Sequence, residues 1–264
     1  MRKEFKKFKR IKKRGSFLKN RLFLFGVGII ASVECFFYVI VFFPFIQIQD
    51  VKVEGNKEIS ENQIKGIVIE RLWGKFFFLP TASIFLTNTH GMQDALLKVI
   101  PELESADIQR RFPNSLIVVV RERVASAIWC QEFSCVEIDR EGIAFKRVES
   151  ALEGIMIYGQ GQPIDLKETA VKKEVLDAIL EFAKEAKRQS LFFHGELSFE
   201  IISNSEIHAH TGEGWDVYFT NTQDLSWQNT KLQTVLKNKI LPERRKDLEY
   251  IDVRFGDQAY LKYH

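Results

Sequence analysis

The sequence has 264 residues, of which 45% are hydrophobic and 28% charged, with a formal net charge of +3. This composition excludes a disordered chain, a collagen and a small disulfide-stapled scaffold, and the length suffices for one large domain or two modest ones. The charge is unevenly distributed, because residues 1–21 hold eleven Lys or Arg against one acid, whereas residues 46–264 hold 27 bases against 33 acids. We therefore expect no nucleic-acid binding by the main body of the chain.

A long apolar run follows the basic tail. Residues 22–45 contain a single ionisable side chain, Glu34, and a helix of this length spans ~36 Å, enough to cross a hydrocarbon core of ~30 Å. The pattern predicts a basic cytoplasmic tail over 1–21 and a transmembrane helix over 22–45. A cleaved signal peptide fits less well, since its apolar region is shorter and ends in small residues. The positive-inside rule then places residues 46–264 outside the cytoplasm.

Glu34 lies near the middle of the predicted span. An acid at this depth is costly unless it is neutral or has a partner. It is either a protonated bystander or a hydrogen-bonding contact to a partner helix, and we prefer the second interpretation.

The residues after the span alternate between strand-like and helical patterns. Residues 46–53 predict a short strand, and Ser60 with Gln63 forms a capping box before a helical pattern. A second helical pattern ends at Pro101, and two β-rich runs follow it. The order β-α-α-β-β predicts one small domain over 46–123.

The remainder, residues 124–264, consists mainly of short strand-like runs. Two amphipathic helical patterns interrupt them, around residues 171–186 and 225–240. We predict a mixed, largely antiparallel β domain with two helices, in which Trp215 and Trp227 belong to the core. The fold class of the whole chain is α+β.

Two cysteines lie in the predicted extracytoplasmic part. Cys130 and Cys135 flank four residues between two strand-like runs. A disulfide survives outside the cytoplasm, and a cross-strand bridge at the base of a hairpin is geometrically allowed. Two free thiols are the alternative, and the spacing alone does not indicate zinc.

No catalytic or cofactor-binding motif is recognisable. The sequence lacks a phosphate-binding loop, a nucleophile elbow and a zinc-protease motif. His208 and His210 share one face of a predicted strand and are a candidate metal pair, but exposed, solvated histidines fit this pattern better. We expect that the chain is not an enzyme and that it binds no metal, no cofactor and no small-molecule substrate.

Four short segments occur in a fixed order: 51–56 (VKVEGN), 111–123 (RFPNSL followed by VVVRER), 139–142 (DREG) and 250–255 (YIDVRF). Together they resemble the FtsQ/DivIB family of bacterial cell-division proteins, over residues 20–264. The resemblance implies a single membrane span, a POTRA domain over 46–123 and a β domain over 124–264. The chain departs from some members of the family in stopping at His264, directly after the last predicted strand.

The resemblance implies a non-enzymatic scaffold at the division septum of the cytoplasmic membrane. Such a scaffold binds small bitopic proteins of the FtsB/FtsL (DivIC) type, together with other divisome membrane proteins, and couples them to septal peptidoglycan synthesis. In the family, the open edge of the final strand takes up a strand of the partner. The implied partner-binding residues are Arg254, Phe255, Ala259, Tyr260, Leu261, Lys262 and Tyr263.

The residues of the last strand support this interpretation independently, because an unpaired edge is either a liability or a surface for β-augmentation. Alternation places Ala259, Leu261 and Tyr263 on one face, opposite Tyr260 and Lys262. Proline at position 260 is then expected to remove a donor from the edge and weaken binding. As aromatic anchors, Phe255 and Tyr263 either contact the partner or pack into the sheet's own core.

Two other functions are weaker alternatives. POTRA-like modules also serve as docking domains in membrane-anchored protein transport and envelope assembly, but those modules normally precede a barrel, and no barrel-sized stretch of strands is present. An exported cell-wall hydrolase requires a catalytic constellation that the sequence lacks.

Overall fold

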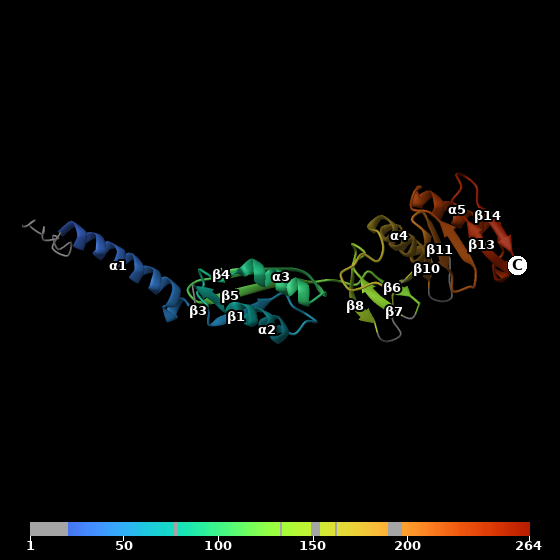
Figure 1. Ribbon diagram of the computed structural model, residues 1–264. Helices are drawn as coiled ribbons and strands as arrows, with labels where there is room; N and C mark the ends of the chain where they lie inside the picture. Colours follow the sequence, from blue (N-terminus) through green and yellow to red (C-terminus); the bar gives the residue numbers. More distant parts are fainter. Residues whose placement is uncertain (1–20, 77–78, 133, 149–153, 162, 190–196) are drawn as a thin grey trace, which may run out of the picture. The chain divides into compact units, whose positions relative to one another are not determined.

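The computed structural model of the chain describes residues 21–76, 79–132, 134–148, 154–161, 163–189 and 197–264 (Figure 1). The predicted tail over 1–21 lies, except for Arg21, outside the described residues. The chain divides into two compact units. One contains the segments up to Glu54, Asn62–Gln93 and Ile108–Val119, and the other contains Gly55–Glu61, Asp94–Asp107 and Val120–His264.

The first helix, α1 (Arg21–Phe42), is the one helix among the described residues that is long and apolar enough to cross a membrane. It ends three residues earlier than predicted. Phe43 has an extended backbone (φ −64°, ψ 125°) and precedes Pro44, which opens the short helix η2 (Pro44–Ile46). A residue before proline is disfavoured in the α conformation, so the proline ends α1.

The next elements form a three-stranded sheet with two helices. The strands are ordered β1 (Asp50–Glu54), β5 (Ser115–Glu122) and β4 (Leu103–Arg111), and β1 pairs in parallel with β5. Helices α2 (Glu61–Leu72) and α3 (Thr89–Val99) complete the predicted β-α-α-β-β order. The structure adds a hairpin of β2 (Gly74–Phe76) and β3 (Leu79–Thr81) between the two helices, which the predicted order of elements does not contain.

The turn after β1 is held by backbone geometry and by one carboxylate. Gly55 has φ +91°, and a Cβ there would lie 2.2 Å from the carbonyl oxygen of Val120, so glycine is required. The carboxylate of Glu122 accepts the N–H groups of residues 57–59 at 2.7, 3.0 and 3.0 Å. These bonds tie the approach to α2 onto the end of β5.

The C-terminal sheet has nine strands. In chain order they are β6 (Ala127–Gln131), β7 (Ser134–Ile138), β8 (Ala144–Val148), β9 (Met156–Tyr158), β10 (Ser198–Ser203), β11 (Glu206–His210), β12 (Asp216–Phe219), β13 (Leu248–Asp252) and β14 (Tyr260–Tyr263). Their spatial order is β14-β13-β12-β11-β10-β9-β6-β7-β8. Antiparallel neighbours outnumber parallel ones, which confirms the predicted mixed, largely antiparallel domain.

Strand β9 was not predicted, although it lies in the interior of this sheet. It pairs in parallel with β6 on one side and with β10 on the other, and so joins two groups of strands. Its three residues, Met156–Tyr158, are too few to show a clear alternation, and both partner strands are distant in sequence.

Two helices cover one face of the nine-stranded sheet, α4 (Lys173–Gln189) and α5 (Leu225–Asn238) (Figure 1). The ring of Phe182 on α4 stacks on Phe219 of β12, with ring centroids 4.4 Å apart. Trp215 is buried in this core as predicted, but Trp227 is 45% exposed. The prediction that Trp227 belongs to the core is therefore wrong. Its indole N–H donates to the carbonyl oxygen of Gly256, 3.2 Å away, at the surface.

Candidate protein-binding edge of the C-terminal sheet

Strand β14 is the outermost strand at one end of the nine-stranded sheet. It pairs antiparallel with β13, with Leu261 opposite Ile251 and Lys262 opposite Tyr250, and all four of its residues are exposed. The loop from β13 to β14 covers residues 253–259, and it turns at Gly256 and Asp257, where the N–H of Gln258 donates to the carbonyl oxygen of Phe255 (2.9 Å).

The opposite end of the sheet is partly covered by another segment of the chain. At β8, the N–H of Ala144 donates to the carbonyl oxygen of Glu168 (3.0 Å), and the N–H of Lys167 donates back to Ala144 (2.6 Å). Ile143 also bridges to Thr169. Of the two outermost strands, β14 is therefore the one without such a covering segment among the described residues.

The hydrogen bonds around β13 show which backbone groups of β14 point outward. The N–H of Val253 donates to Tyr218 of β12, so the backbone of Asp252, one residue earlier, faces β14. The N–H of His264 donates to the carbonyl oxygen of Asp247, 3.0 Å away. We infer from both observations that the N–H and C=O groups of residues 260 and 262 point toward β13. Those of residues 261 and 263 point toward the open edge.

This geometry corrects one expectation from the sequence. Proline at position 260 removes a donor that bonds to β13 and leaves the donors at the open edge in place. The residues whose N–H groups are available to an added strand are Leu261 and Tyr263.

A groove of about 410 Å³ runs beside the edge strand, between β14 and α5. From β14 and the loop before it, Ala259, Leu261 and Tyr263 line the groove, and from α5, Trp227 and Val235 are among the residues that face them. The predicted alternation on β14 is thus correct, because Lys262 lies on the other face, over the ring of Tyr250. The edge offers both unpaired backbone groups and an apolar groove for side chains.

A buried lysine on α5 holds the loop that precedes β14. The Nζ atom of Lys231 donates to the carbonyl oxygens of Val253 (2.6 Å) and Gly256 (2.7 Å). Burial lowers the pKa of Lys231, and the carboxylates of Asp257 and Asp252 oppose this effect. The loop held in this way presents the side chain of Phe255 to solvent.

The two aromatic anchors are both on the surface. Phe255 is 52% exposed and Tyr263 is 37% exposed. The ring of Phe255 makes an edge-to-face contact with Tyr260, at 5.5 Å between centroids, and the guanidinium of Arg244 lies 5.2 Å from the centroid of Tyr263. The alternative in which these rings pack into the sheet's own core does not describe this structure.

Arg254 lies next to Phe255 but is engaged within its own sheet. Its guanidinium pairs with Asp252 (2.6 Å) and with Glu206 of β11 (2.7 Å). The hydrogen bond to Asp252 raises the pKa of Arg254, and Glu206 adds to the effect. A partner that contacts Arg254 meets a guanidinium already oriented by two carboxylates.

A row of stacked rings crosses the outer face of the sheet beside this edge, and no local sequence pattern indicates it. His208 stacks on Tyr218 (3.7 Å between centroids), and Tyr218 stacks on Tyr250 (4.5 Å). Lys262 extends the row over Tyr250. Each ring comes from a different strand, so only the register of β11, β12, β13 and β14 brings them together.

The two histidines of β11 are not simply solvated, because each has carboxylate neighbours. Nε2 of His208 lies 3.0 Å from Glu206, while Nδ1 of His210 lies 2.8 Å from Asp216 and its Nε2 lies 3.6 Å from Glu200. The hydrogen bond with Asp216 raises the pKa of His210. No cluster of three or more metal-ligating side chains occurs in the described part of the chain.

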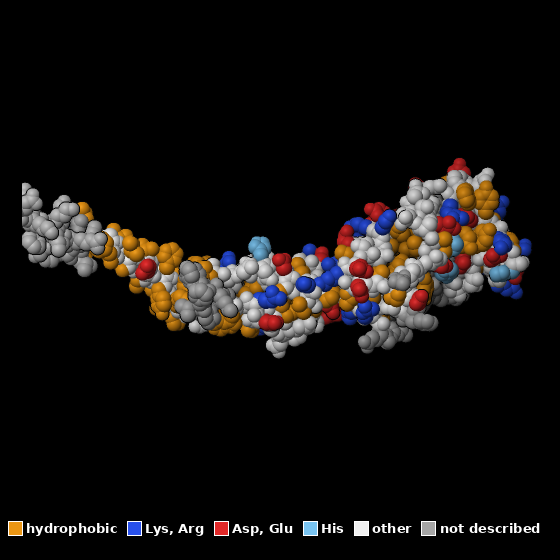
Figure 2. All heavy atoms as spheres, viewed as in Figure 1, with side chains coloured by type: hydrophobic (Ala, Val, Ile, Leu, Met, Phe, Trp, Pro, Cys, Tyr) orange, Lys and Arg blue, Asp and Glu red, His pale blue; other side chains and the backbone are white. Residues whose placement is uncertain are grey.

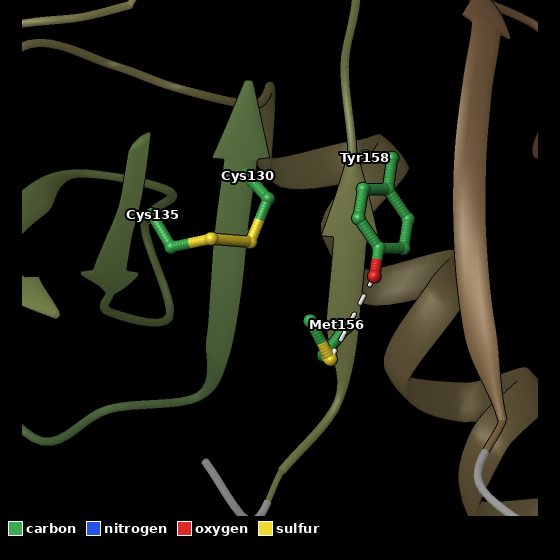
Figure 3. The surroundings of a disulfide bond; sticks show 4 residues. All are labelled: Cys130, Cys135, Met156 and Tyr158. Atoms are coloured by element: carbon green, nitrogen blue, oxygen red, sulfur yellow. Dashed lines mark hydrogen bonds between the residues drawn. A yellow bond between two sulfur atoms is a disulfide. The ribbon is translucent and has the colours of Figure 1, made fainter. Parts of the chain in front are cut away.

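The remaining predicted site residues lie away from the edge. Figure 3 shows the disulfide between Cys130 and Cys135, with an S–S distance of 2.06 Å, beside Met156 and Tyr158 of β9. The two cysteines are directly opposite each other on β6 and β7, and five strands separate β6 from β14. Glu34 is exposed on α1, in the other unit.

Two comparisons with known proteins bear on this architecture. Residues 46–123 match the family model of the POTRA domain, FtsQ-type. The chain is also 27% identical over 127 residues to the cell division protein FtsQ of Syntrophotalea carbinolica. That alignment covers 48% of this chain and 42% of the relative, so the chain matches less than half the length of that protein.

Proposed function

We propose that this chain, a member of the FtsQ/DivIB family with an FtsQ-type POTRA domain, is a non-enzymatic scaffold of bacterial cell division. In this proposal α1 crosses the cytoplasmic membrane once, residues 1–21 lie in the cytoplasm, and residues 46–264 lie outside it at the division septum. The domain match and the FtsQ relative support the division role. The basic tail that precedes α1 supports the orientation.

The proposed partners are small bitopic division proteins of the FtsB/FtsL (DivIC) type, whose binding couples the scaffold to septal peptidoglycan synthesis. The observation that carries this proposal is the open edge of β14, where the backbone groups of Leu261 and Tyr263 point away from β13. An extended segment of a partner pairs with such an edge through main-chain hydrogen bonds.

The side chains around the edge give this pairing specificity. Successive residues of an added strand point to opposite faces of the sheet. On one face they enter the groove lined by Leu261 and Tyr263, and on the other they meet Tyr260 and the exposed ring of Phe255. We therefore expect a partner segment with apolar side chains at alternate positions.

The experiment compares proline and alanine at one edge position. Leu261→Pro removes the outward N–H together with the leucine side chain, whereas Leu261→Ala removes only the side chain. Each full-length variant is purified in detergent, and its binding to the FtsB- or DivIC-type protein of the same organism is measured. Main-chain pairing contributes about 1 kcal/mol per hydrogen bond, so we expect Leu261→Pro to bind at least about fivefold more weakly than Leu261→Ala.

Tyr263→Pro and Tyr263→Ala form a second pair that tests the other outward donor. If both proline variants bind the partner as tightly as their alanine counterparts while remaining folded, pairing at the open edge is wrong. If the unaltered chain binds no protein of this class, the proposed partner is wrong.

A further inference from the structure

A band of exposed apolar side chains lies at the C-terminal end of α1, within the same compact unit as the helix. Exposed fractions in this membrane-proximal band range from 45% to 64%. Its members come from four short segments and are Phe43, Phe45, Trp73, Phe85, Leu86 and Phe112. In Figure 2, hydrophobic side chains continue from α1 onto the adjoining part of the same unit.

Backbone hydrogen bonds hold two of these segments against the residues that follow α1. The N–H of Ile84, directly before Phe85, donates to the carbonyl oxygen of Ile46 at 3.0 Å. The N–H of Gln49 donates to Asn114, two residues after Phe112. The rings of Phe85 and Phe112 then meet, with centroids 5.3 Å apart.

Trp73 is placed at the same end by the β2–β3 hairpin. It directly precedes Gly74, which pairs with Thr81. The hydroxyl of Thr81 donates to the carbonyl oxygen of Val41 in the last turn of α1, 2.7 Å away. The indole of Trp73, at 64% exposure, therefore belongs to a segment that is bonded to the helix end.

Polar side chains of the folded unit also cap α1. Its last carbonyls have no partner within the helix, yet Ser83 donates to Ile40 (2.9 Å), while Gln47 (2.7 Å) and Thr81 donate to Val41. A helix of 22 residues is ~33 Å long, so these carbonyls lie at the boundary of a hydrocarbon core of ~30 Å. Water is scarce there, and the caps replace it.

We propose that the membrane-proximal band docks into the lipid headgroup–acyl boundary of the leaflet on the side of residues 46–264. The folded unit is then seated on the bilayer through aromatic rings that occupy the interface, as Trp does in membrane proteins. Arg71 and Arg111 are exposed next to Trp73 and Phe112, within reach of lipid phosphates. This inference goes beyond the proposed division role and requires only that α1 crosses the membrane.

The test places a photo-crosslinking residue, p-benzoylphenylalanine, at single positions of the full-length chain in nanodiscs of phosphatidylethanolamine and phosphatidylglycerol. Positions 85 and 112 probe the band, and position 37 within α1 is the positive control. Position 119 is the matched control, because Val119 is exposed on β5 and pairs with Glu54 at the end of β1 away from α1. Lipid adducts are quantified by mass spectrometry.

We expect about tenfold more lipid adduct at positions 85 and 112 than at position 119, since interfacial side chains enter the acyl boundary by 5–10 Å. Adducts at position 37 but only background at 85 and 112 would overturn the proposal. Absence of adducts at position 37 would overturn its premise that α1 lies in the bilayer. Because partner proteins are absent from the nanodiscs, adducts at 85 and 112 report lipid itself.

Discussion

Lys231 on α5 donates from its buried Nζ atom to the carbonyl oxygen of Val253, 2.6 Å away, just after β13 ends. The same atom also bonds Gly256, so one side chain fixes the loop that leads from β13 to the edge strand. The position of the edge thus depends on a residue that belongs to neither strand.

We predict that Lys231→Met lowers the free energy of unfolding by about 1–3 kcal/mol, because it removes the donor that Lys231 supplies to the buried carbonyl oxygen of Val253. Thermal unfolding of the full-length chain in detergent measures the effect. Lys237→Met, an exposed lysine on the same helix, is the control and should change little. Equal stability of the two variants would show that Lys231 does not hold the loop.

We predict that Tyr260→Pro and Leu261→Pro differ in their effect on stability. Proline at 260 removes a hydrogen bond between β14 and β13, and should cost about 1–3 kcal/mol in the free energy of unfolding beyond the loss in Tyr260→Ala. Proline at 261 removes an outward donor and should cost little beyond Leu261→Ala. Chemical unfolding of the four variants checks the comparison, and a larger proline penalty at 261 would reverse the assigned backbone directions.

We predict that stability falls with rising pH because of His210. The hydrogen bond with Asp216 raises the pKa of His210 above its ordinary value of 6.5. The contribution of His210 to the free energy of unfolding is therefore complete below about pH 6.5. It is lost as the pH rises through the pKa of His210 in the folded state. Thermal unfolding of the unaltered chain between pH 5.5 and 9 should show this loss, and His210→Gln should remove it.

The exposed histidine at position 90 supplies the control for this pH experiment. His90→Gln should leave the pH dependence as it is in the unaltered chain. An unchanged pH dependence in His210→Gln would contradict the assignment.

We predict that the double variant Cys130→Ser, Cys135→Ser is destabilised by about 2 kcal/mol, the chain-entropy value for closing a loop this short. A reducing agent should destabilise the unaltered chain by a similar amount, and Cys35→Ser should have no such effect because Cys35 is a free thiol. The shift in melting temperature measures each of these effects on stability. If the reducing agent causes no shift while the double variant does, the loss comes from packing and not from the disulfide.

Local patterns were sufficient to predict most of the secondary structure. The apolar stripe around residues 171–186 became α4 (Lys173–Gln189), and the alternating runs on either side of Cys130 and Cys135 became β6 and β7. These elements were predictable because side-chain periodicity reports which face is buried. Strand β9 was missed because its pairing with β6 and β10 depends on residues far away in the chain.

The candidate edge was predictable only in part. The resemblance to a known family indicated the last strand and its residues, and alternation correctly separated Leu261 from Lys262. It could not show that the N–H of Tyr260 faces β13, because the direction of a backbone group depends on register with a partner strand. Nor could it show the stacking of His208, Tyr218 and Tyr250, whose rings come from three strands.

The sequence by itself determined the apolar helix, the basic tail before it, the order of the helices and of most strands, and the family resemblance. These features depend on composition and on contacts between residues close in the chain. The tertiary structure decided which strand is outermost, which of its backbone groups are available, and which apolar rings gather at the end of α1. Those properties arise from hydrogen bonds between distant segments, such as Ile84 with Ile46, which no local pattern encodes.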